Sequence, residues 1–325
     1  MKFEIKCLRF GIAVLIFAVF VRFFGGEFAA NLQQLSQDPS VSSLLLYAGT
    51  GKVYHPSETV PPTQPEEPVE TEPPETEAIL PVFSPEDATL ISIKNQPGYA
   101  IDVAAMLQTP LSWNLTDTEP TVLIFHSHTC ESYQNTEGYD PSDTYRTQDC
   151  RYNMVSVGEH LAACLEEKGI AVIHDKTIHD YPSYNDAYTL SRQTVKEYLA
   201  KYPSIQLVLD LHRDAYVDDT GKQASQTVTV NGQKASRLML VAGTGYSHTT
   251  WQENLSLAVK LQAVLEKEYP GLCRDVTMRT YYFNQDLSPG MLLVEVGTAG
   301  DTRENALCAA ELLAEGIAQL AHGTN

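Results

Sequence analysis

Short apolar runs alternate with longer amphipathic segments along the chain from residue 91 onward. Each run is rich in leucine or β-branched residues and is typical of a buried strand. Predicted strands cover Val122–Phe125, Ile170–Ile173, Ile205–Leu211, Arg237–Ala242 and Met291–Val296. Apolar residues recur at helical spacing between them, and predicted helices cover Met154–Lys168, Ala187–Lys201, Thr250–Glu268 and Thr302–Ala321. This alternation predicts an α/β domain with a mostly parallel or mixed central sheet flanked by helices.

Two of these helices carry signals at their ends. The first is followed by Gly169, a residue that commonly ends a helix. The last is preceded by Asp301, with Glu304 three residues later, which resembles a capping box. We therefore expect Asp301 to cap the last helix.

The N-terminal region has a different pattern. Three basic residues precede the apolar stretch Phe10–Phe24. A basic flank followed by an apolar run is typical of a signal peptide or a signal-anchor helix, and no convincing small-x-small cleavage site follows. Residues 1–30 are therefore predicted to be a cytoplasmic N-terminus and one transmembrane anchor. The protein is then expected to be a single-pass protein of the cell membrane, with most of the chain outside the cytoplasm.

Three further parts follow the predicted anchor. Residues 31–54 form a juxtamembrane segment. Residues 55–90 alternate proline with glutamate and contain almost nothing to bury, so we expect a disordered, extended linker that holds the next domain away from the membrane. Residues 91–325 have the size of one globular domain.

Charge and cysteine content exclude several classes of function. The net charge is −19, which argues against binding to nucleic acid or a polybasic attachment to anionic lipid. The six cysteines include no C-x-x-C pair, so a structural zinc ribbon is not expected. Cys130 lies beside His128 and could suggest a Cys/His nucleophile, but a small buried hydrophobic residue is the preferred interpretation.

Polar side chains gather where the first predicted strand ends. The segment Thr121–Tyr133 reads TVLIFHSHTCESY, so His126, His128 and Glu131 follow an apolar strand directly. Functional groups in open α/β sheets collect at the carboxyl ends of strands. The H-x-x-E pair brings an imidazole and a carboxylate within reach of one metal ion. The simpler alternative is that Glu131 caps a helix and one histidine is a core residue.

Two other strands end in the same way. His212 follows the strand IQLVLDL, and Asp210 lies two residues before it, placed to orient its ring. Glu295 lies inside the apolar strand MLLVEVGT, where a carboxylate is costly unless it is paired or used in chemistry. His128, Glu131 and His212 are thus candidate ligands of a catalytic Zn²⁺, and Glu295 is a candidate general base. His174 and His179 are reserve candidates.

Several longer stretches resemble the stage II sporulation protein P family, which belongs among the zinc-dependent N-acetylmuramoyl-L-alanine amidases. The stretches are FHSHTCESY, HDKTIHDYPSYNDAYTLSRQTVKEYL, LDLHRD, YFNQDLSP and VEVGTAGDTRENA, in this order along the chain. The resemblance implies that His128 and His212 bind zinc and that Glu295 is the catalytic glutamate. For the middle ligand we choose Glu131, and Asp149 stays open. Arg213 or His126 is a candidate to assist the oxyanion or to bind a stem-peptide carboxylate.

The same resemblance implies a peptidoglycan hydrolase that cuts the N-acetylmuramoyl-L-alanine amide bond, together with cross-links, during engulfment in sporulation. It also implies two partners, a lytic transglycosylase and a membrane protein of the engulfment complex. Two alternatives remain. One is another zinc hydrolase, a carboxypeptidase or deacylase. The other is a non-catalytic, membrane-tethered protein that binds the cell wall.

Overall fold

The computed structural model describes residues 83–111, 114–115, 118–134, 138–141, 144–245 and 248–322. Their helices are η1 (Pro85–Leu90), α3 (Val103–Gln108), α4 (Met154–Glu167), α5 (Ala187–Lys201), α6 (Trp251–Glu268), η2 (Gln285–Leu287) and α7 (Arg303–His322). The strands are β1 (Ile93–Asn95), β2 (Val122–Phe125), β3 (Val172–His174), β4 (Leu207–Asp214), β5 (Thr227–Val230), β6 (Gln233–Ser236), β7 (Leu238–Gly243), β8 (Val276–Arg279) and β9 (Met291–Thr298).

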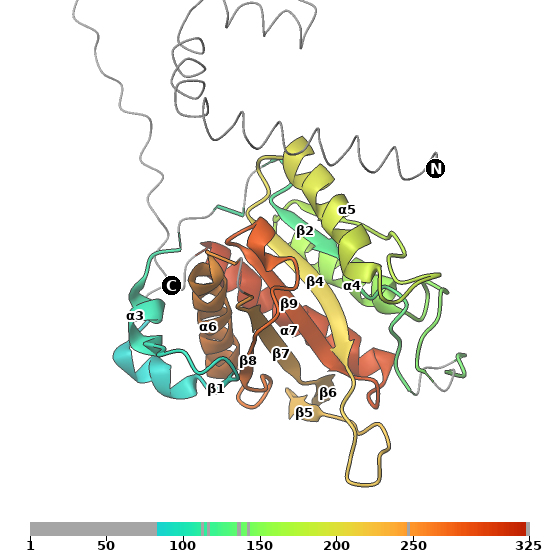
Figure 1. Cartoon of the computed structure of the whole chain (residues 1–325). Helices are drawn as coiled ribbons and strands as arrows, with labels where there is room; N and C mark the ends of the chain where they lie inside the picture. The colour runs from blue at the N-terminus through green and yellow to red at the C-terminus, as the bar shows by residue number, and fades with distance from the viewer. Residues whose placement is uncertain are drawn as a thin grey trace, which may run out of the picture. The chain divides into compact units, whose positions relative to one another are not determined.

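Among these residues one seven-stranded sheet forms the centre, with the strand order β1-β8-β7-β9-β4-β2-β3 (Figure 1). Every neighbouring pair is parallel except β7 and β9, which are antiparallel. The strands β5 and β6 form a separate hairpin. The predicted α/β class, with a mostly parallel central sheet between helices, is confirmed.

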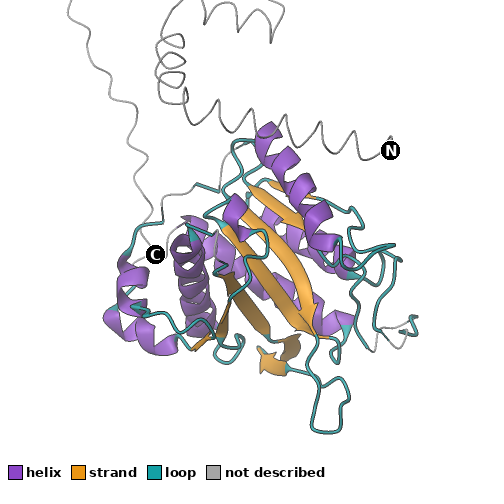
Figure 2. Ribbon diagram, viewed as in Figure 1, coloured by secondary structure: helices purple, strands orange, loops and turns teal. Residues whose placement is uncertain are grey.

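Helices cover the two faces of the sheet unequally (Figure 2). On one face, α4, α6 and α7 bury the large apolar cluster that contains Leu161, Leu261 and Leu313. On the other face, α5 packs with Val195 against a smaller cluster over β2 and β4. Among the described elements no helix covers the rest of that face, where Met239, Val241 and Leu293 form a small cluster with Phe283. The sheet is therefore open over β7 and β8.

The five predicted strands and four predicted helices are all present, with ends shifted by a few residues. Gly169 ends α4 in the left-handed region, with a φ of 75°, as expected. The cap predicted for α7 is wrong. Thr302 directly precedes α7, and its Oγ1 accepts a hydrogen bond from the Asn305 amide at 3.2 Å. Asp301 instead accepts the amide N–H of Thr298 at 2.9 Å and that of Gln226 at 2.9 Å.

The N-terminal boundary also differs from the prediction. The helix η1 lies inside the range 55–90 that was assigned to the linker, and it packs against α6 with Asp87 buried. Packed structure therefore begins before residue 91. The predicted anchor at 1–30, the segment at 31–54 and the linker up to residue 82 lie outside the described residues. Within the described ranges, no helix combines the length and the apolar character that a membrane span requires.

Candidate metal-binding and catalytic site

The loop after β2 carries the first two candidate ligands. The amide of Glu131 donates to the carbonyl of His128 at 3.2 Å, so the chain turns between them and both side chains point the same way. The Nδ1 of His128 lies 3.5 Å from Oε1 of Glu131, and both residues are buried. The H-x-x-E pair therefore has the close geometry that its spacing predicted.

The strand β4 brings in the third candidate ligand. It pairs directly with β2, with Asp210 beside Phe125, so His212 projects just beyond the end of β2. The Nδ1 of His212 lies 3.5 Å from Oε2 of Glu131. One ligand atom each from His128, Glu131 and His212 falls within 4.8 Å of the others. Tetrahedral zinc with bonds of about 2.0–2.1 Å spaces its ligand atoms by about 3.3–3.4 Å, so this group fits such an ion.

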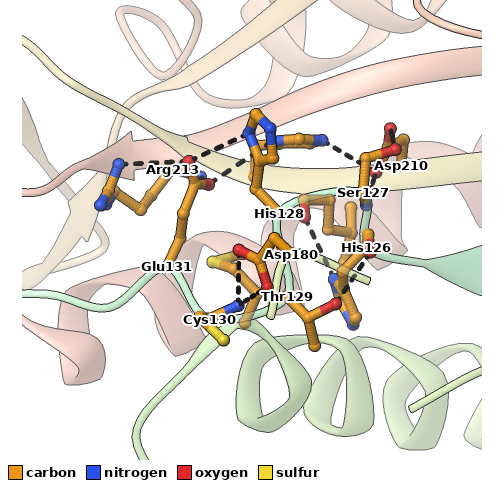
Figure 3. Close-up of polar contacts among 12 residues, drawn as sticks. His126, Ser127, His128, Thr129, Cys130, Glu131, Asp180, Asp210 and Arg213 are labelled. Atoms are coloured by element: carbon orange, nitrogen blue, oxygen red, sulfur yellow. Dashed lines mark hydrogen bonds and ion pairs between the residues drawn. The ribbon is translucent and has the colours of Figure 1, made fainter. Parts of the chain in front are cut away.

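The buried Asp210 carboxylate contacts Ser127, as Figure 3 shows, and also lies next to the ring of His212. Oδ1 of Asp210 lies 2.8 Å from Nε2 of His212 and accepts the amide N–H of Ser127 at 2.7 Å. Oδ2 accepts the hydroxyl of Ser127 at 2.7 Å. Burial alone would lower the pKa of His212, but Asp210 and Glu131 outweigh it and hold that pKa well above 6.5. Asp210 therefore fixes the ring so that Nδ1 faces Glu131.

Arg213 holds Glu131 in place. Its guanidinium lies 3.3 Å from Oε1 of Glu131, and its amide donates to Oε2 at 3.1 Å. The same side chain donates to the carbonyls of Ser132 and Tyr145 at 3.1 and 2.9 Å. Burial favours the neutral acid, but Arg213 and the two histidines outweigh it and hold the pKa of Glu131 well below its usual range. With its donors used in this way, Arg213 is placed to position Glu131.

Glu295 lies on β9 directly beside His212 in the sheet register. Its Oε2 is buried and has no hydrogen-bond partner in the described part of the chain. Burial, with smaller contributions from Glu131 and Asp214, raises the pKa of Glu295 to about 8 against the opposing effect of His212. A carboxyl group with one buried, unpaired oxygen next to three candidate metal ligands fits an acid–base role better than a structural one.

Gly297 follows Glu295 by two residues, and the backbone conformation at the end of β9 requires a glycine there. Gly297 has a φ of 74°, and a Cβ there would overlap the Asp301 carboxylate and lie 2.6 Å from Ser236. Here the pairing of β4 with β9 shifts register between His212 and Asp214. The glycine in the sequence VEVG thus permits the backbone turn next to Glu295.

The remaining candidates lie outside the group formed by His128, Glu131 and His212. The Asp149 carboxylate is exposed and pairs with Arg151 at 2.6 Å, so the structure brings Glu131 and not Asp149 to the histidines. His126 is fully buried, hydrogen-bonded to the Leu211 carbonyl at 3.1 Å and to His174 at 2.9 Å, which excludes direct contact with a substrate. His179 lies 2.8 Å from the His126 carbonyl and 2.9 Å from the Thr194 hydroxyl.

Cys130 packs as a buried residue. Its amide donates to the Asp180 carboxylate at 3.1 Å. Burial and Asp180 raise the pKa of its thiol to about 12, so the thiolate needed for a nucleophile does not form at neutral pH. The preferred sequence interpretation of Cys130 agrees with this environment.

A groove with a volume of about 400 Å³ opens onto the three candidate ligands and Glu295, with the open part of the sheet as its floor. Aromatic residues that sequence reasoning did not single out line it: Tyr184, Tyr188, Tyr281 and Phe283. The Tyr184 ring stacks on His128 with centroids 4.4 Å apart. Tyr184 and Tyr188 lie within a stretch that carries the family resemblance, and this was the only feature of the sequence that could have pointed to them.

Comparison with known proteins identifies the family. The model of the family described as Stage II sporulation protein P (SpoIIP) matches residues 47–318. Stage II sporulation protein P of Bacillus subtilis (strain 168) is 29% identical over 223 residues, which cover 63% of this chain and 52% of that protein. The chain thus spans about half the length of this curated relative.

Solved structures of amidases show limited similarity. N-acetylmuramoyl-L-alanine amidase AmiC2 of Nostoc punctiforme is 13% identical, with a TM-score of 0.36, over 62% of this chain and 95% of that one. The N-acetylmuramyl-L-alanine amidase Ami1 from Mycobacterium smegmatis is 10% identical, with a TM-score of 0.40, over 64% and 99% of the two chains. The family assignment rests on the sequence match, and by it the chain belongs to the stage II sporulation protein P family.

Proposed function

We propose that this protein is a zinc-dependent peptidoglycan amidase that cleaves the N-acetylmuramoyl-L-alanine amide bond during sporulation. The observation that carries the proposal is the placement of Glu295, with its unpaired oxygen, beside the group formed by His128, Glu131 and His212. Three protein ligands and an adjacent carboxyl group are typical of a catalytic rather than a structural zinc site. Membership of the family supports the sporulation setting.

When bound, zinc would polarise the scissile carbonyl and make water easier to deprotonate. His128, Glu131 and His212 would hold it, and Asp210 and Arg213 would keep His212 and Glu131 in their orientations. Glu295 would take the proton from the attacking water and then return it to the leaving amine. A raised pKa suits both steps, and the ionised form that a base requires is favoured once a dication occupies the neighbouring ligands.

The rest of the proposal follows the family. We propose that residues 1–30 anchor the chain in the cell membrane, that residues 31–54 and a linker follow, and that the domain acts on the septal wall during engulfment. A lytic transglycosylase and a membrane protein are the proposed partners. Cleavage of peptide cross-links is a proposed second activity.

The test uses the full chain on purified peptidoglycan, with mass analysis of the products, in the presence and absence of a chelator. We expect free stem peptides and peptide-free glycan, lost with the chelator and restored by zinc. Glu295→Gln should retain the zinc content of the wild type and lose turnover by about 10²–10⁴-fold. Asp149→Asn, an exposed carboxylate outside the site, is the matched control.

Three results would contradict the proposal. Release of C-terminal amino acids or acyl groups alone would indicate the carboxypeptidase or deacylase alternative. Binding to the wall without cleavage, even with the proposed partners added, would indicate the non-catalytic alternative. Near-normal activity of Glu295→Gln would remove Glu295 from the mechanism.

A further inference from the structure

The groove at the candidate site adjoins a second cavity on the same open face of the sheet. This second cavity has a volume of about 260 Å³. Asp214, Met239 and Arg279 line both cavities, so they form the boundary between them. The two cavities therefore adjoin, and a ligand at the candidate metal-binding group has the second cavity next to it, over β7 and β8.

The second cavity is lined by cations in a strongly acidic chain. Four basic residues line it, against two acidic ones, while the whole chain has a net charge of −19. The basic residues are Lys94, Arg237, Arg274 and Arg279. A concave surface with this charge concentrates anions.

Two of the four cations are already used by the fold. Arg274 pairs with Asp214 at 2.7 Å, which also neutralises one of the two acidic residues of the lining. Arg237 donates to the carbonyls of Gly271 and Cys273 at 2.9 and 2.6 Å. Both side chains are thus fixed in the wall of the cavity.

Lys94 and Arg279 differ from these two, because neither has an ion-pair partner among the residues that the structure describes. Lys94 on β1 is paired in register with Thr277 on β8, and Arg279 follows Thr277 by two positions. Since residues two apart on a strand share a face, the two cations lie on the same open face of the sheet. Arg279 also lines the groove that contains His212 and Glu295.

We propose that this surface is a subsite for the carboxylates of an acidic peptide, with Arg279 as the contact nearer the catalytic groups and Lys94 as the outer contact. The proposal rests on the proposed function and extends it, because it assigns the peptide part of the substrate to the side of β7, β8 and β1. Arginine suits the inner position because its planar guanidinium can bind a carboxylate through two parallel hydrogen bonds.

The first test measures binding to the full chain by titration calorimetry. The probes are a synthetic tripeptide with free carboxylates and its fully amidated analogue. We expect the wild type to bind the acidic peptide at least about tenfold more tightly, and this preference to weaken as salt is raised. Arg279→Gln and Lys94→Gln should each reduce the preference several-fold, whereas Arg279→Lys should retain most of it. Lys196→Gln on α5, an exposed lysine away from the cavity, should leave it unchanged.

The second test measures kcat/KM on muramyl peptides with free or amidated stem carboxylates, and the same variants should lose discrimination between them. If neither substrate is cleaved, the proposed function fails, and the binding experiment still decides the subsite. Equal binding of both tripeptides by the wild type would overturn the subsite. So would full preference in an Arg279→Gln protein whose thermal unfolding midpoint matches the wild type.

Discussion

The support that Asp210 gives to His212 can be tested by changing its charge without changing its shape. In Asp210→Asn the amide oxygen can stay where Oδ1 lies, 2.8 Å from Nε2 of His212 and 2.7 Å from the Ser127 amide. The hydroxyl of Ser127 already contacts Ser191 Oγ at 2.8 Å and can rotate to accept from the new NH₂ group. The substitution therefore removes the negative charge and little else.

The size of the effect follows from the loss of charge at that contact. A hydrogen bond to an ionised group contributes about 1.5–3 kcal/mol, roughly twice a neutral one. Losing about half of that amounts to about 1–1.5 kcal/mol, or about tenfold in equilibrium constant. Because the ring of His212 becomes less basic and less firmly oriented, we expect zinc to bind about tenfold more weakly to Asp210→Asn.

The assay is competition for zinc between the full chain and a chromophoric chelator. The matched control is Asp286→Asn, which removes the charge of a partly buried carboxylate outside the site that pairs with Arg192 at 2.6 Å. The control should lose stability but keep its affinity for zinc. An affinity for zinc within twofold of wild type in Asp210→Asn would refute the reasoning that Asp210 acts through His212.

Three further predictions concern stability. Gly297→Ala should lower the free energy of unfolding by about 1–3 kcal/mol through backbone strain, and by a further amount because the new Cβ overlaps Asp301. Gly98 has a similar φ but open space around it, so Gly98→Ala should show the loss from backbone strain alone. Urea denaturation of the two variants measures the difference. Chelation of zinc should lower the thermal midpoint of both wild type and Glu295→Gln, since a metal present at about 100 times its Kd stabilises the folded state by about 2.7 kcal/mol. Burial, aided by Lys176, lowers the pKa of His174 to about 4, so below its ordinary value of 6.5 only the unfolded chain takes up this proton. As the pH is lowered from 6.5 to 4, the free energy of unfolding should therefore decrease by up to about 1.4 kcal/mol per pH unit, and His174→Asn should reduce that slope. An unchanged slope would contradict the role of His174 in this pH dependence.

The sequence predicted the longer elements because their apolar pattern is set by burial on one or both faces. It did not predict β1, β8 or the hairpin of β5 and β6, since these short strands contain polar residues and lack the continuous apolar run of Val122–Phe125. The sequence also did not predict that β7 is antiparallel to β9, because a fully apolar strand has the same hydrophobic pattern in either direction.

The candidate site could be predicted in part, for a related reason. His128, Glu131 and His212 stand out as polar residues at the ends of apolar strands, and the structure brings them together. Arg279 and Tyr184 do not stand out in this way, and the only sequence signal for Tyr184 was the family stretch that contains it. Only the register of β8 and the fold of the loop before α5 bring them to the groove.

The position of β9 has a consequence for how the chain folds. Among the described residues it is the last strand in sequence order, yet it lies fourth of seven in the sheet, between β7 and β4. Until β9 is made, the earlier strands can form only two separate half-sheets with unpaired edges. Pairing over such long sequence separations is slow, because loop closure must precede the contacts that stabilise it. Glu295 therefore joins the histidines only when the sheet is completed, and a chain whose β9 has not yet been synthesised cannot have the complete candidate site.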